Sequence, residues 1–91
     1  MLLFNLRFSS GFREATHFVR VDNLEPKGAG LQAEGSTFLE AVDNLVDLLN
    51  QPPEQSRDLA FADFCDGKPR AVVQWKVLDR ILNDPRCEVK L

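Results

Sequence analysis

The sequence has few of the residues that build most catalytic and metal centres. Its 91 residues include one histidine and two cysteines, Cys65 and Cys87, neither of which has a second cysteine or a histidine at short spacing. Zinc sites typically combine such ligands at short spacing, so a metal site here would need ligands from scattered loops. The sequence therefore predicts no catalytic residue, no metal and no cofactor, and it favours structural cysteines over a disulfide.

Long apolar runs are also missing. The chain begins Met-Leu-Leu-Phe, but Asn5 and Arg7 interrupt the run well before the length of a signal-peptide core or a membrane span. Glycine and proline are too scattered for a low-complexity segment, and 44% apolar with 27% charged residues is an ordinary globular composition. We therefore expect a soluble cytoplasmic protein with no membrane segment and one domain over residues 1–91.

Two segments could suggest a reaction site, but neither has the pattern that such a site needs. The segment 28–30 (Gly-Ala-Gly) lacks the third glycine and the strand-to-helix context of a phosphate-binding loop, so it is interpreted as a turn. Asp63, Cys65 and Asp66 lie close together in sequence, and with His17 they could be considered a metal or nucleophile site. A thiol nucleophile needs a histidine base nearby, and aspartates are common at strand ends and turns, so structural roles are favoured.

Charge is divided unevenly along the chain. Residues 1–65 hold five basic and ten acidic side chains, whereas residues 66–91 hold six basic and four acidic ones, for a net charge of −3 overall. Affinity for phosphate backbones rests on clustered lysine and arginine, so this distribution favours a charged protein partner or self-association over general nucleic-acid binding.

Period-two alternation predicts antiparallel strands in the first third of the chain. Residues 2–8 form the first expected strand, and Ser9-Ser10-Gly11 is the expected turn. A second strand over residues 17–22 places His17 on the core side with the neighbouring valines. A loop over 23–30 and a short strand over 31–34 complete the expected meander.

A helix from about Phe38 to Asn50 is predicted next, with Thr37 as its N-cap and Glu40 completing a capping box. Its apolar face should cover the sheet, and acidic side chains occupy the opposite face. The apolar face consists of Phe38, Val42, Leu45, Val46 and Leu49, and the polar face of Glu40, Asp43, Asp47 and Asn50.

The second half of the chain allows two interpretations. Prolines end the first helix, residues 59–64 have the composition of a strand, and residues 87–91 alternate as a short final strand. Between them, Asp66 and Gly67 could turn a hairpin into residues 71–77, but a helix over 70–83 is preferred. The predicted fold is α+β, a single two-layer domain with a mainly antiparallel sheet covered by one or two helices (β-β-β-α-β-α-β). The preferred helix places Ala71, Trp75, Leu78, Ile81 and Leu82 on one face and Lys76, Asp79, Arg80 and Asn83 on the other.

The segment 35–44, Gly-Ser-Thr-x-x-Glu-Ala-x-x-Asn, resembles the helix start of the HicB-type antitoxin core, with Ser36 in place of the usual aspartate. The resemblance covers residues 2–51, and the remaining residues show no helix-turn-helix or ribbon-helix-helix pattern. It implies a partially ferredoxin-like fold that dimerises and binds a small, basic toxin ribonuclease.

These observations lead to a hypothesis of a non-enzymatic protein-protein interaction module, such as an antitoxin-like protein, a phage-type inhibitor or a small regulatory adaptor. A homodimer is expected through an open sheet edge at the C-terminal strand. The alternative is a small nucleic-acid-binding regulatory protein, because Arg7, Arg13 and Arg20 lie beside phenylalanines that could stack on bases. The candidate partner-binding residues are Glu40, Asp43, Asp47, Arg70, Lys76 and Arg80.

Overall fold

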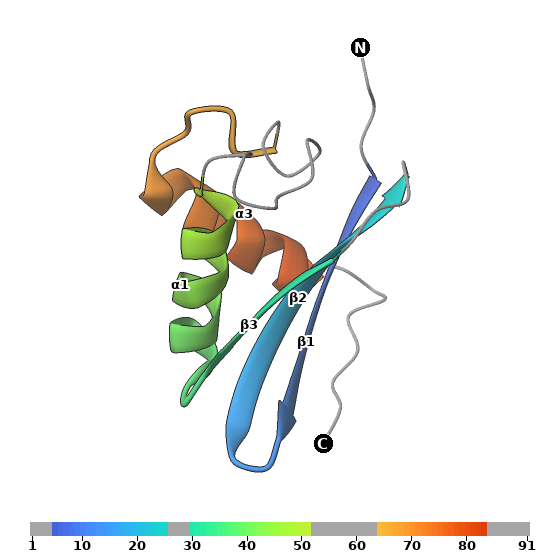
Figure 1. The fold of residues 1–91 in the computed structure, drawn as a ribbon, viewed down its shortest axis with the longest axis vertical. Coiled ribbons are helices and arrows are strands. Elements are labelled where there is room, and N and C mark those ends of the chain that lie inside the picture. The colour runs from blue at the N-terminus through green and yellow to red at the C-terminus, as the bar shows by residue number, and fades with distance from the viewer. Residues whose placement is uncertain (1–4, 26–29, 52–63, 84–91) are drawn as a thin grey trace.

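Three strands and two helices build the fold in the computed structural model, which describes residues 5–25, 30–51 and 64–83. The strands are β1 (Asn5–Arg13), β2 (Thr16–Glu25) and β3 (Leu31–Gly35), and the helices are α1 (Phe38–Leu49) and α3 (Arg70–Asn83). The strands form an antiparallel sheet in the order β1-β2-β3. Both helices lie on one side of this sheet (Figure 1). The predicted α+β class is therefore confirmed.

The first hairpin turns later than the sequence suggested. The turn predicted at Ser9-Ser10-Gly11 is wrong, because β1 continues to Arg13 and pairs without interruption from Leu6 onwards. The chain reverses at Glu14 and Ala15, whose φ angles of 53° and 60° match the left-handed pair that a two-residue hairpin loop requires. Gly11 fits inside the strand because the ring of Phe18, its partner on β2, occupies the space of the missing side chain.

The core lies between the sheet and the two helices. The strands contribute buried residues from one face, and α1 contributes a continuous buried stripe, which confirms the predicted helix and its covering role. Phe38, at the start of the helix, is only partly buried. The buried strand residues are Leu6, Phe8, Val19, Val21 and Ala33, and the buried α1 residues are Ala41, Val42, Leu45, Val46 and Leu49.

The segment 70–83 is a helix, as preferred, but its predicted inner face is largely wrong. The buried residues are Val73, Val77 and Ile81, spaced four residues apart. Trp75 and Leu82, which were predicted to share the apolar face of this helix, are 64% and 74% exposed. These three β-branched side chains pack against α1 and β1. The larger apolar side chains of the helix therefore face outwards.

Of the strand predicted over residues 59–64, the structure describes only Phe64. This residue is helical, as is Cys65, so the prediction is not supported there. The Phe64 ring packs against Phe8, with 5.7 Å between ring centroids. Residues 59–63 and the predicted final strand at 87–91, including Cys87, lie outside the described residues. So do residues 2–4 of the first predicted strand. Within the described ranges, no helix combines the length and apolar character needed to cross a membrane.

Candidate functional site

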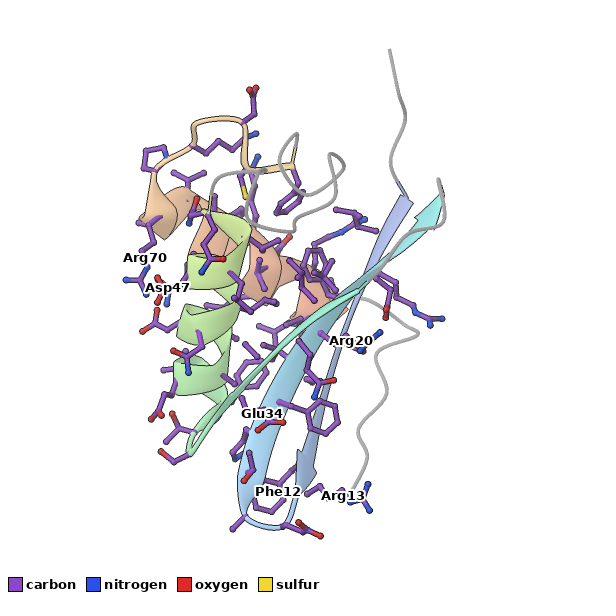
Figure 2. The ribbon with its side chains drawn as sticks, in the orientation of Figure 1. Phe12, Arg13, Arg20, Glu34, Asp47 and Arg70 are labelled. Carbon is purple, nitrogen blue, oxygen red and sulfur yellow. The ribbon has the colours of Figure 1, made fainter. Side chains whose placement is uncertain are left out.

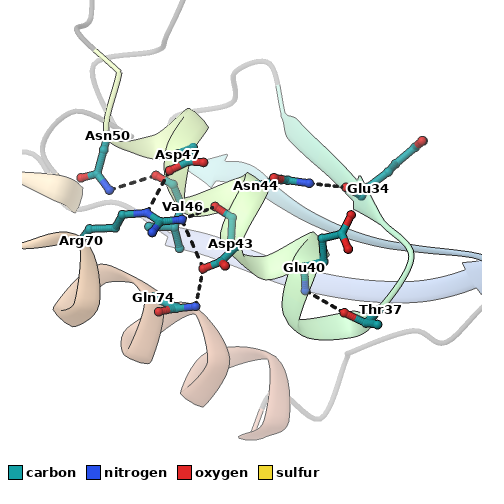
Figure 3. Close-up of polar contacts among 10 residues, drawn as sticks. All are labelled: Glu34, Thr37, Glu40, Asp43, Asn44, Val46, Asp47, Asn50, Arg70 and Gln74. Atoms are coloured by element: carbon teal, nitrogen blue, oxygen red, sulfur yellow. Dashed lines mark hydrogen bonds and ion pairs between the residues drawn. The ribbon is translucent and has the colours of Figure 1, made fainter.

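The residues that carry the antitoxin resemblance all help to join β3 to α1. A Cβ atom on Gly35 would lie 2.6 Å from the Ala41 backbone nitrogen, so the first turn of α1 needs a glycine there. The Thr37 side chain accepts a hydrogen bond from the Glu40 amide at 3.1 Å, which confirms the predicted N-cap. Asn44 Nδ2 donates to the Glu34 carbonyl oxygen at 2.7 Å and ties the helix to β3 (Figure 3). This motif is explained by the fold without any ligand.

Glu40, the first candidate partner-binding residue, lies exposed in the first turn of α1. Its carboxylate accepts a hydrogen bond from Ser36 Oγ at 2.8 Å. Ser36 stands where the antitoxin signature usually has aspartate, and here its hydroxyl supplies the donor that an aspartate would lack. Glu40 therefore contributes to the start of the helix while its side chain remains open to solvent.

Asp43 and Asp47 on α1 form ion pairs with Arg70 on α3 (Figure 3). Arg70 Nε lies 2.9 Å from Asp47 Oδ1, and Arg70 Nη2 lies 3.2 Å from Asp43 Oδ1. Gln74 Nε2 also donates to Asp43 Oδ1 at 2.5 Å. All three charged side chains are about half exposed, so each pair contributes at most about 1 kcal/mol. The acidic stripe of α1 is thus partly neutralised from within the chain.

Lys76 and Arg80, the remaining candidates, lie on α3 beyond this network. Lys76 is half-buried and Arg80 is exposed. Within the part of the chain that the structure describes, neither forms an ion pair. Three of the six candidates are therefore linked by ion pairs between α1 and α3, and the other three lie outside this network.

The outward face of α3 carries most of the residues that the sequence placed together on one apolar face of this helix. We call Ala71, Trp75, Leu78 and Leu82 the α3 stripe; Val72 flanks it and is 41% exposed. Leu78 is partly buried and packs against the core, whereas Ala71, Trp75 and Leu82 are exposed. Among the described residues, Leu82 and Trp75 are the two most exposed large apolar side chains.

The sheet has a second face, which the two helices leave uncovered. Strand register places Arg7, Arg13, Phe18 and Arg20 on this face, opposite to the side that carries Phe8 and Val19. We call it the open sheet face. Figure 2 shows Arg13, Arg20 and Glu34 along the sheet. A shallow depression of about 660 Å³ there is lined by Ser9, Ser10, Arg13, Glu14, Thr16, Phe18, Arg20, Gln32 and Glu34.

Charge on the open sheet face is mixed. Arg20 Nε donates to Asp22 Oδ1 at 2.8 Å, so one arginine is already paired. Among the described residues, Arg7 and Arg13 have no ion-pair partner. The three arginines share this region with three carboxylates, Glu14, Asp22 and Glu34. The face therefore presents both signs around the Phe18 ring.

Alternation in the sequence placed the arginines near aromatic residues. It did not identify the β3 residues that lie beside them in the sheet. Gln32 and Glu34 reach the depression because β3 pairs Gln32 with Arg20 and Glu34 with Phe18. The alternation of the buried Ala33 with these two polar residues was the sequence signal for the face of the sheet on which they lie. Their position opposite particular β2 residues depends on strand register, which no local pattern encodes.

His17 and Cys65 have structural surroundings. His17 is half-buried on the same face as Val19, as expected, and its ring lies 4.6 Å from that of Phe12. The buried Cys65 donates from Sγ to the Leu49 carbonyl oxygen at 2.6 Å, at the end of α1. A search of residues 5–25, 30–51 and 64–83 finds no group of three or more histidine, cysteine or acidic side chains placed to hold a metal.

The chain matches no protein-family model, no curated protein and no solved structure at the similarity that the comparisons required. A function must therefore be inferred from the surfaces of the molecule.

Proposed function

We propose that this protein is a non-enzymatic interaction module of the cytoplasm that binds a partner protein through the open sheet face. One observation carries the proposal: both helices cover the same side of the sheet, and the other side has a depression lined by Phe18, Arg13 and Arg20. An antitoxin-like protein or a phage-type inhibitor would act through such a surface by binding its partner, without catalysing a reaction.

The composition of the face suits a protein partner. Aromatic residues and arginine are enriched in protein interfaces, where they act as anchors. Phe18 offers an apolar ring braced against Gly11, and Arg13 offers a guanidinium that can bind a carboxylate in a bidentate manner. Glu34 lies opposite Phe18 and adds an acceptor. We therefore propose a partner segment with an apolar side chain flanked by charges of both signs.

Single-stranded nucleic acid is the second candidate for the same face. Bases stack on aromatic side chains of exposed sheets while arginines contact phosphates, and Phe18, Arg7 and Arg13 share this face. Glu14, Asp22 and Glu34 weaken this candidate, because they oppose the positive potential that a phosphate backbone needs.

Purification of the tagged protein from its native host, with and without nuclease, tests both candidates. We expect a nuclease-resistant protein at fixed stoichiometry that is lost with Arg13→Glu or Gln32→Lys on the open sheet face. Arg80→Glu on α3 is the matched control, because it reverses the charge of an exposed arginine that lies away from the open sheet face. This variant should retain the partner. Binding that disappears with nuclease and weakens steeply with salt would favour nucleic acid instead. A partner retained by both sheet variants would overturn the assignment of this face.

A further inference from the structure

The ring of Phe18 lies over Gly11 on the open sheet face. The two residues are register partners on β2 and β1, so they are cross-strand neighbours. A Cβ atom on Gly11 would meet Cζ of Phe18 and would lie 2.8 Å from Cε1 and 3.1 Å from Cε2. These two distances are nearly equal, so the ring turns a face, and not one of its sides, towards the strand. Gly11 is consequently buried, although it belongs to the uncovered side of the sheet.

This arrangement leaves the opposite face of the Phe18 ring open. Phe18 is only half-buried, and it lines the depression of about 660 Å³. Among residues 5–25, 30–51 and 64–83, the aromatic contacts join Phe8 to Phe64 and Phe12 to His17, so neither of them covers this ring. The depression therefore offers one flat apolar surface that a planar group can stack on.

A hydrogen-bond acceptor lies beside this surface. Glu34 is the register partner of Phe18 on β3, so it lies on the other side of Phe18 from Gly11. Its side chain is exposed, and in the part of the chain that the structure describes its carboxylate forms no ion pair. Arg20, diagonally opposite Glu34, is held by Asp22 at 2.8 Å. The Glu34 carboxylate is thus available to accept an N–H or O–H from a bound group.

We propose that the partner protein places a tyrosine or tryptophan side chain in this depression, stacked on Phe18 and donating a hydrogen bond to Glu34. Aromatic rings favour offset stacking, and these two side chains combine a ring with a donor at its edge. A leucine would neither stack nor supply the donor. Gly11 is then a positioning residue, because any side chain there would displace the Phe18 ring. The inference rests on the proposed function, since it names the side chain by which that partner binds.

N-acetyl-tryptophanamide tests the site without the partner protein. In a two-dimensional NMR titration at millimolar concentration, it should shift the backbone amide signals of Gly11, Phe18 and Glu34. N-acetyl-leucinamide should bind about fivefold more weakly, because it cannot stack. Equal responses to the two probes, or shifts confined to other elements, would overturn the proposal. A larger response to adenosine monophosphate would also overturn it, in favour of a nucleic-acid base.

Gly11→Ala tests the positioning of the ring. The added Cβ meets the far end of a rotatable side chain, so the ring can move aside and the variant should fold, as circular dichroism would verify. Its affinity for N-acetyl-tryptophanamide should fall about fivefold, and Phe18→Leu should have the same effect. Gly67→Ala is the matched control, because no atom lies within 4 Å of its added Cβ, and it should bind the probe like the parent. Unchanged affinity in folded Gly11→Ala would contradict the proposal.

The hydrogen bond to Glu34 is tested by methylating the probe at its indole nitrogen. The methylated probe should bind the parent more weakly than N-acetyl-tryptophanamide does, and this difference should vanish in Glu34→Ala. Equal binding of both probes to the parent would overturn the role of Glu34. Capture of the partner separates this inference from the proposed function. If Arg13→Glu loses the partner while Gly11→Ala and Phe18→Leu retain it, the open sheet face is the interface but the stacked ring is wrong.

Discussion

Gly35 shows how one absent side chain fixes the junction between β3 and α1. A Cβ atom there would lie 2.6 Å from the Ala41 nitrogen and 2.9 Å from the Glu40 carbonyl carbon. Since these are backbone atoms, no rotamer change can relieve the overlap. We expect Gly35→Ala to lower the free energy of unfolding by about 1–3 kcal/mol, measured by urea denaturation.

Gly67 provides the comparison for this prediction. Its φ is +66°, but no atom lies within 4 Å of the added Cβ. Gly67→Ala should therefore cost only the left-handed backbone penalty, about 1 kcal/mol. A Gly35→Ala variant as stable as the parent would show that α1 does not approach β3 this closely.

The hairpin turn carries avoidable backbone strain. Glu14 and Ala15 both have positive φ, where residues with a Cβ atom are disfavoured by about 1–2 kcal/mol. Ala15→Gly should therefore raise the free energy of unfolding by about 0.5–1 kcal/mol, seen as a higher melting temperature. Ala33→Gly, at a buried position inside β3, should lower it. Equal effects from both substitutions would argue against the two-residue turn.

At the scale of elements, α1 holds the two layers together. Leu45 has no exposed surface, whereas Leu39 on the same helix is 60% exposed. Leu45→Ala should lower the free energy of unfolding by about 2–5 kcal/mol, because it leaves a cavity against the sheet. Leu39→Ala should change it by no more than about 0.5 kcal/mol. Urea denaturation of the two variants separates a core position from a surface position, and similar losses would place the helix in another orientation.

The elements that could be predicted are those whose signals are local. The N-cap at Thr37 and the apolar positions of α1 lie within one short segment, so the sequence indicates both the start of this helix and its inner face. The second hairpin strand was likewise indicated by alternation around Val19 and Val21. In each case the residues that decide the structure are sequence neighbours.

The parts that could not be predicted depend on distant residues. Helix α3 contains two apolar stripes, and only packing against α1 and β1 decides that Val73, Val77 and Ile81 face inwards. Neither Glu14 nor Ala15 is a residue typical of tight turns, so Ser9-Ser10-Gly11 gave the stronger but misleading signal. The pairing of Asp43 and Asp47 with Arg70 could not be predicted, because it joins residues more than twenty positions apart.

For the whole molecule, binding at the open sheet face should be separable from folding. Arg13→Glu should abolish capture of the partner protein while the free energy of unfolding changes by no more than about 0.5 kcal/mol, because Arg13 is exposed and forms no ion pair among the described residues. Co-purification and urea denaturation of this variant would measure the separation, and a large loss of stability beside the loss of capture would show that the variant acts through folding.

The meander also has a consequence for the order in which the chain folds. Each strand pairs with the next along the chain, and α1 follows β3 directly, whereas α3 must reach back to β1. Local pairings of this kind form quickly, so a chain still emerging from the ribosome can complete its sheet and first helix before α3 has been synthesised. Pulse-labelling hydrogen exchange during refolding should then protect β1 and β2 amides before those of α3, and simultaneous protection would rule out this order.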